Sequence, residues 1–323
     1  MNYRFITMLV GAVIAWLACC GAAQVQDYPT RPIRVISALA AGGGSDVFAR
    51  TLANGLQRAM AVPVVVENRP GGSESIGARA CADSSPDGYT VCILSNEVIV
   101  YNQFLYKNFP FDATNDLEPI AGLFLNTFGL AVNSKLQVKT IRELVALSKA
   151  KPGTLSYGTF SFPLAGFMDK LKMQSGSDIV RVPFRGGGEL VNAMLAGSTP
   201  IGLLGLSNMI PQIEAGRLTV LAVNSKKRSP LFPDVPTFLE EGREEYPPPW
   251  FGLFGPKGIP KPVIHKLGNE VARIIGAPDF REKMFISRGV EPMDIIYGEL
   301  ASFINEDRRS AERIVKESGY QPQ

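Results

Sequence analysis

The chain is 323 residues long, and its 33 lysine and arginine residues nearly balance 30 aspartate and glutamate residues, which leaves a formal net charge of +3. Such a balance gives no reason to expect nucleic acid or an anionic membrane surface as a partner. The length is sufficient for two domains with separate hydrophobic cores.

The first 23 residues are typical of a secretory signal peptide. Arg4 supplies a positive charge, residues 5–20 form a short apolar run, and Gly21-Ala22-Ala23 provides a small-residue cleavage site. The alternatives are a retained membrane anchor and a lipoprotein acylated at Cys19 or Cys20, although the residues before these cysteines fit a lipobox poorly. Cleavage after residue 23 would leave 300 of the 323 residues, and no later segment is apolar enough to span a bilayer.

Two cysteines remain after that cleavage, Cys81 and Cys92. An oxidising compartment would allow them to form a disulfide, and Pro86-Asp87-Gly88 between them is a turn signal that would bring them together. Two buried free thiols are the alternative. Two thiols and the distant His265 make a poor zinc site, so no metal is expected.

In chain order, the first third alternates strand and helix signals. The expected elements are a strand at 33–37, a helix at 47–60 capped by Ser45 or Asp46, a strand at 62–67, a helix near 76–83 and a strand at 89–94. This alternation predicts a parallel, doubly wound α/β sheet. Ligands of such sheets bind beyond the carboxyl ends of the strands.

The pattern restarts near residue 128. Strands are expected at 129–132, 155–157, 179–182, 201–204 and 218–224, with helices at 189–196 and 210–215 and another that runs from the capping box Thr140-Ile141-Arg142-Glu143 to about residue 150. A proline-rich tract marks a crossover before amphipathic helices at 263–275 and 299–317. We therefore expect residues 24–127 and 233–323 to form one lobe and residues 128–232 a second, with a cleft that closes by hinging.

Enzyme chemistry finds little support. No Gly-x-Ser-x-Gly motif is present, and the single histidine, His265, begins a surface-like helix. Gly42-Gly43-Gly44 lacks the third glycine of the dinucleotide fingerprint, and there is no P-loop motif. The carboxylate of Asp46 at a helix N-terminus would repel a phosphate, so no nucleotide and no other cofactor is expected.

The triple glycine is instead predicted to bind a small anion. Glycine backbone can approach a ligand closely, and the helix that follows directs its unpaired N–H groups to the same place. Hydroxyl groups and main-chain donors can hold a carboxylate without a counter-charge. The candidate ligand residues at strand ends are Gly42, Gly43, Gly44, Ser45, Ser95, Asn96, Thr159, Ser161, Arg185, Gly186 and Gly187. Each could alone be a turn or cap residue, and Arg185 could be simply exposed, but their recurrence in both halves favours binding.

Motifs spread over nearly the whole mature chain carry a resemblance to a known family. They are Tyr28-Pro29-x-Arg31-Pro32-Ile33-Arg34, Gly42-Gly43-Gly44-Ser45-Asp46, Val66-Glu67-Asn68-Arg69-Pro70-Gly71, Pro86-Asp87-Gly88-Tyr89-Thr90, Ala215-Gly216-Arg217-Leu218, Arg228-Ser229 and Pro233-Asp234-Val235-Pro236-Thr237. In this order they resemble the Bug family, the periplasmic solute-binding proteins of tripartite tricarboxylate transporters.

The resemblance implies a type II periplasmic-binding-protein fold, in which two doubly wound lobes enclose a central cleft. It also implies a periplasmic protein that captures a small carboxylate, such as a dicarboxylate, citrate or an acidic amino acid, and delivers it to membrane permease subunits. We expect the protein to be a monomer. The carboxylate would be held by residues 41–46 and by the loop after Tyr157-Gly158, which adds Ala41, Asp46 and Phe160 to the candidate residues. A ligand-sensing partner of a membrane histidine kinase is the alternative, and a secreted enzyme a distant third.

The chain departs from the family pattern in places. Ala41 stands where the family usually has a proline, and Pro200 replaces the usual acidic residue of the second lobe. The second loop, residues 159–163, is short, contains two phenylalanines and lacks the usual histidine. We therefore expect a ligand that is smaller or more apolar than a tricarboxylate.

Overall fold

The computed structural model describes residues 28–184, 186–243 and 247–322. The predicted signal peptide, with Cys19 and Cys20, and the candidate ligand residue Arg185 lie outside these ranges. In the described part of the chain, no helix combines the length and the apolar character that a membrane crossing requires.

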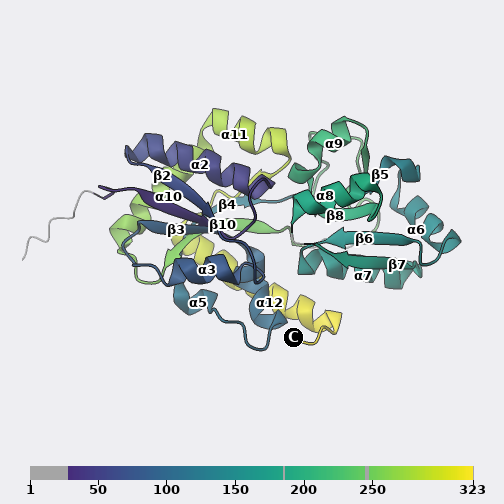
Figure 1. Cartoon of the computed structure of the whole chain (residues 1–323), viewed down its shortest axis with the longest axis horizontal. Helices are drawn as coiled ribbons and strands as arrows, with labels where there is room; N and C mark the ends of the chain where they lie inside the picture. Colours follow the sequence, from purple (N-terminus) through teal and green to yellow (C-terminus); the bar gives the residue numbers. More distant parts are fainter. Residues whose placement is uncertain (1–27, 185, 244–246, 323) are drawn as a thin grey trace, which may run out of the picture. The chain divides into compact units, whose positions relative to one another are not determined.

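The first sheet has six strands in the order β11-β4-β10-β3-β1-β2 (Figure 1). The strands are β1 Ile33–Ser37, β2 Val64–Asn68, β3 Thr90–Ser95, β4 Leu117–Leu125, β10 Trp250–Pro256 and β11 Glu291–Pro292. β1 runs parallel to β2 and β3, as the strand and helix signals predict. The sheet is nevertheless mixed, because β10 pairs antiparallel with both β3 and β4.

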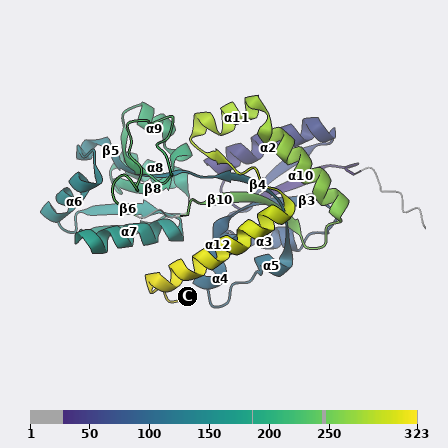
Figure 2. The same ribbon diagram turned by 180° about the vertical axis from the view of Figure 1, so that it is seen from behind.

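Helices cover both faces of this sheet. They are α2 Gly44–Met60, α3 Ser75–Ala82, α4 Asn102–Leu105, α5 Ala113–Asp116, α10 Lys261–Gly276, α11 Pro278–Met284 and α12 Tyr297–Ser318, with a π-helical turn η1 Glu97–Tyr101 and a 3-10 turn η4 Ile286–Arg288. α2 and α10 pack together on one face, whereas α3 and α12 lie on the other (Figures 1 and 2). Their apolar residues face the sheet, as their helical periodicity predicts.

The second sheet has five strands in the order β7-β6-β8-β5-β9. The elements are β5 Phe128–Asn133, η2 Ser134–Leu136, α6 Ile141–Ala150, β6 Leu155–Thr159, α7 Phe162–Ser175, β7 Ile179–Pro183, α8 Gly187–Ala196, β8 Ile201–Gly205, η3 Leu206–Asn208, α9 Ile210–Glu214 and β9 Leu218–Val223. β6 is parallel to β7 and β8, whereas β5 is antiparallel to β8 and β9. α6 and α7 pack on one face of the sheet and α8 and α9 on the other.

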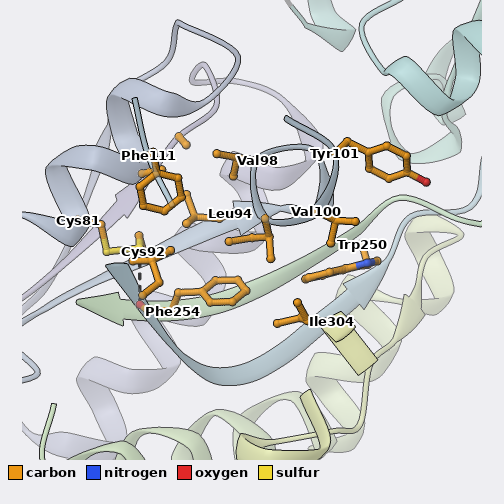
Figure 3. Close-up of a cluster of buried hydrophobic side chains, with 14 of the residues drawn as sticks. Cys81, Cys92, Leu94, Val98, Val100, Tyr101, Phe111, Trp250, Phe254 and Ile304 are labelled. Atoms are coloured by element: carbon orange, nitrogen blue, oxygen red, sulfur yellow. Dashed lines mark hydrogen bonds between the residues drawn. A yellow bond between two sulfur atoms is a disulfide. The ribbon is translucent and has the colours of Figure 1, made fainter. Parts of the chain in front are cut away.

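A buried cluster between β3, β10, α3 and α12 forms the core on one face of the first sheet (Figure 3). Trp250 and Phe254 of β10 contribute large side chains to it. Cys81 of α3 and Cys92 of β3 form the predicted disulfide, and both residues are fully buried. The disulfide therefore ties a helix to the sheet that it covers.

Candidate functional site

The glycine loop joins the end of β1 to the start of α2. Gly42 has a φ of +88°, a backbone conformation that other residues rarely adopt. Gly43 is the N-cap residue of the 17-residue helix α2 and has no side-chain cap hydrogen bond. Its carbonyl accepts the N–H groups of Asp46 and Val47, each at 3.1 Å. Among the described residues, none accepts a hydrogen bond from the N–H groups of residues 43–45. These groups form a donor cluster at a positive helix end.

Asp46 braces this loop rather than capping the helix. Its Oδ2 accepts hydrogen bonds from the Gly42 N–H at 3.0 Å and from Arg50 Nε at 3.1 Å, while Oδ1 accepts from Asn68 Nδ2 at 2.9 Å. Burial alone would raise its pKa, but these donors together hold the pKa of Asp46 below its usual range. The prediction that Ser45 or Asp46 is the N-cap is therefore wrong. The helix begins earlier, at Gly44, and the Asp46 side chain accepts the Gly42 N–H within the loop before it.

Replacing Asp46 with alanine should lower the free energy of unfolding by about 2 kcal/mol, because three donors would lose a charged acceptor that is itself buried. Urea unfolding measures this loss. Asp83→Ala is a matched control, since Asp83 pairs with Arg79 over the same four-residue spacing at a more exposed position. That control should cost less than about 0.5 kcal/mol. Equal losses in the two variants would contradict the bracing role of Asp46.

The candidate residues Ser95 and Asn96, at the end of β3, have buried side chains. The Glu74 carboxylate accepts the Ser95 N–H at 3.1 Å and also the Ser95 hydroxyl. The side chain of Asn96 is buried beside Asp307, whose Oδ2 accepts Trp250 Nε1 at 2.6 Å. Ser95 is therefore bound to Glu74 within the first sheet's surroundings, whereas the side-chain nitrogen and oxygen of Asn96 are buried without a hydrogen-bond partner among the described residues.

Glu97, two residues after the end of β3, contacts the second sheet's lobe. The sequence did not identify it as a candidate site residue. Its Oε1 accepts the hydroxyl of Ser161 at 2.6 Å and the N–H of Phe162 at 3.1 Å. Burial raises the pKa of Glu97 to about 7, an effect that Ser161 opposes and the nearby Glu74 carboxyl increases. Its position just after a strand could have marked Glu97 as a candidate. The apolar residues that follow it in the sequence instead indicated buried structure.

The candidate residues after β6 lie in the same short loop. Thr159 Oγ1 accepts the Ser161 N–H at 3.3 Å, and both side chains are buried. Ser161 is the N-cap residue of α7, but its hydroxyl donates to Glu97 instead of capping its own helix. Phe160 between them is 37% exposed. This loop is the point where the first sheet's η1 meets the second sheet's α7.

A second meeting point involves η3, which follows β8. A Cβ atom added to Gly44 would lie 2.8 Å from Ser207 Oγ, and one added to Gly187 would lie 2.4 Å from Asn208 Oδ1. The N-termini of α2 and α8 thus both lie against η3. Gly186 is the N-cap residue of α8, and Ala41 is exposed in the loop before Gly42. Ser207 and Asn208 are additional polar residues at a strand end that the sequence analysis did not select.

Sheet topology explains why these residues converge. β1 and β3 are parallel neighbours, so the glycine loop and Glu97 leave the same edge of the first sheet. β6 and β8 are parallel neighbours in the second sheet, so Ser161 and Ser207 share an edge there. The arrangement offers backbone donors to an anion. Among the described residues no cluster of side chains suits a metal ion.

Two α/β sheets whose strand ends meet, with free main-chain donors at the glycine loop, are the arrangement found in the class of periplasmic binding proteins, which solved structures with the same fold represent. Residues 48–320 match the tripartite tricarboxylate transporter family receptor, called TctC, and the chain therefore belongs to this family. It is a solute-binding protein rather than an enzyme. The resemblance to Bug proteins noted in the sequence is thus confirmed.

Known proteins resemble the chain over nearly its whole length. Protein BugT of Bordetella pertussis is 29% identical over 323 residues, which cover 99% of each chain. A solved structure described as a periplasmic transporter is 32% identical, with a TM-score of 0.84 over 91% of this chain and 99% of that one. A Rhodopseudomonas palustris protein solved with adipate is 26% identical, with a TM-score of 0.86 over 92% of this chain and 100% of that one.

Proposed function

We propose that this protein is a periplasmic receptor that captures a small carboxylate-bearing metabolite between two lobes and delivers it to the membrane permease of a tripartite tricarboxylate transporter. The observation that carries the proposal is the set of N–H groups of residues 43–45, which have no protein acceptor among the described residues at the start of α2. A carboxylate placed there would satisfy these donors and interact favourably with the helix dipole. The adipate bound by the R. palustris relative supports a carboxylate ligand.

The lobes in this proposal are residues 24–127 with 233–323, and residues 128–232. The strands of the first sheet lie in the first set and those of the second sheet in the second set, which supports this division. The main chain of Gly43, Gly44 and Ser45 would bind the ligand carboxylate directly. Gly186 and Gly187 would approach it from the second lobe, with Ser207 and Asn208 beside them. Closure around the ligand would be the state that the permease recognises.

A Gly43→Val variant tests the binding site. Gly43 has a φ of −82°, and nothing lies within 4 Å of an added Cβ, so the variant should fold normally. Its side chain would occupy the space in front of the free N–H groups and should weaken carboxylate binding by about 100-fold or more, equivalent to about 2.7 kcal/mol. The measurement is a thermal-shift screen over carboxylates followed by calorimetry with those that bind.

Gly298→Val is the matched control, because Gly298 also lies at the start of a helix and has open space around its Cβ position. This control should bind as the wild type does. Unchanged affinity in Gly43→Val would show that the ligand binds elsewhere.

A further inference from the structure

The N-terminus of α7 already binds a carboxylate that belongs to the protein itself. The helix has 14 residues, and its first donors are the hydroxyl of the N-cap residue Ser161 and the N–H of Phe162. Both donate to one oxygen of Glu97, at 2.6 and 3.1 Å. These are the donors that a ligand carboxylate would need at the carboxyl end of β6.

This contact lies beside the proposed carboxylate site. β3, which carries Glu97, is the parallel neighbour of β1, which carries the glycine loop. β6, which carries Ser161, is likewise the neighbour of β8, which carries Ser207. Because neighbouring strands are about 5 Å apart, we expect the contacts at Gly44 and at Glu97 to be separated by about the length of a small metabolite. A ligand that extends from residues 43–45 toward β3 and β6 therefore meets Glu97.

Aromatic rings hold the α7 terminus at this place. The ring of Phe162 lies 6.4 Å from that of Tyr101 and 5.0 Å, edge to face, from that of Tyr320. The charged groups that act on Glu97 are Glu74, which favours its neutral form, and Arg181, which favours its ionised form. In either protonation state Oε1 can accept both hydrogen bonds, so the donors of α7 are occupied throughout.

We propose that Glu97 takes the place of a second ligand carboxylate, so that the protein selects ligands with one carboxylate group and an uncharged far end. This inference rests on the proposed function. A second carboxylate on the ligand would find its donors occupied and would face the Glu97 side chain, which at alkaline pH carries the same charge. Glu97 is thus a specificity-determining residue.

Calorimetry with carboxylates matched in chain length tests the proposal: butyrate against succinate, hexanoate against adipate, and octanoate against suberate, all at alkaline pH. In the wild type, the monocarboxylate of the best-binding length should bind at least about tenfold more tightly than its dicarboxylate partner. Glu97→Ala frees the donors of α7 and should shift this ratio toward the dicarboxylate by about tenfold or more. Glu97→Gln retains an oxygen acceptor for both donors and should keep the preference for one carboxylate.

Glu214→Ala removes an exposed carboxylate at the end of α9 and should leave the ratio unchanged. A wild type that prefers dicarboxylates, or an Ala variant with the wild-type ratio, would overturn the role of Glu97 while leaving the proposed function intact. Absence of binding to any of these acids in both wild type and Glu97→Ala would instead overturn carboxylate capture itself, and the inference with it.

Discussion

The folded protein should become less stable as the pH rises from about 5 to about 8. Glu97 holds its proton up to a pH of about 7 in the folded chain, whereas an ordinary glutamate releases it near 4.5. Between these values the folded state binds more protons than the unfolded state, so the free energy of unfolding falls with rising pH. Burial, only partly offset by hydrogen bonds, raises the pKa of Glu74 and Asp307 as well, which adds to the same trend.

The contribution of Glu97 alone should be about 3 kcal/mol across this range, from 1.36 kcal/mol for each unit of pKa. The carboxyl groups with lowered pKa values, Asp46, Asp112 and Glu240, act in the opposite sense, but mainly as the pH falls through their ordinary values of 3.8 for the aspartates and 4.5 for the glutamate. Urea unfolding of ligand-free protein at the two pH values measures the change. In Glu97→Gln, the free energy of unfolding should decrease by about 3 kcal/mol less over the same pH range. An equal pH dependence of the free energy of unfolding in both proteins would refute the role of Glu97.

Removing the disulfide between Cys81 and Cys92 should lower the free energy of unfolding by about 3 kcal/mol. The cross-link closes a loop with a sequence separation of 11 residues, and a loop of this size restricts the unfolded chain by about that amount. The expected loss applies to the double variant Cys81→Ala/Cys92→Ala and to the reduced wild type. Urea unfolding with and without dithiothreitol measures it.

The double variant should be insensitive to dithiothreitol, which makes it the internal control for reduction. If the wild type in reductant unfolds at the same urea concentration as the oxidised protein, while a thiol assay shows complete reduction, the cross-link does not contribute to stability as expected.

Much of the first sheet could be predicted because its signals are local. The strand at 33–37 coincides with β1, and the helix predicted from residue 47 ends at Met60 as α2 does. Apolar periodicity and glycine turns determine such elements from neighbouring residues alone. β10, in contrast, is buried along its whole length, and no expected strand covers it. Its conformation depends on pairing with β3 and β4, which lie far away in the sequence.

In the candidate site, too, some features follow from neighbouring residues and others from contacts between distant segments. The glycine loop and its helix are local features, and a close approach of donors to a small anion follows from residues 42–46. α7 was not predicted, and its N-terminal donors belong to Glu97, 64 residues earlier in the chain. Ser95 and Asn96 resemble ligand residues in the sequence, but both are buried in the fold, and the Glu74 carboxyl group, which no local pattern reveals, accepts the hydrogen bonds of Ser95.

The sequence by itself determined the family and the glycine loop, because both depend on short motifs of fixed residue types, and it favoured the disulfide that the structure contains. Only the tertiary structure decided that Asp46 braces the loop and that Glu97 occupies the N-terminus of α7. Both outcomes depend on hydrogen bonds whose partners become neighbours only when β1, β3 and β6 have taken their places in the two sheets. A buried carboxylate must accept hydrogen bonds, and the folded chain decides which donors lie close enough to supply them.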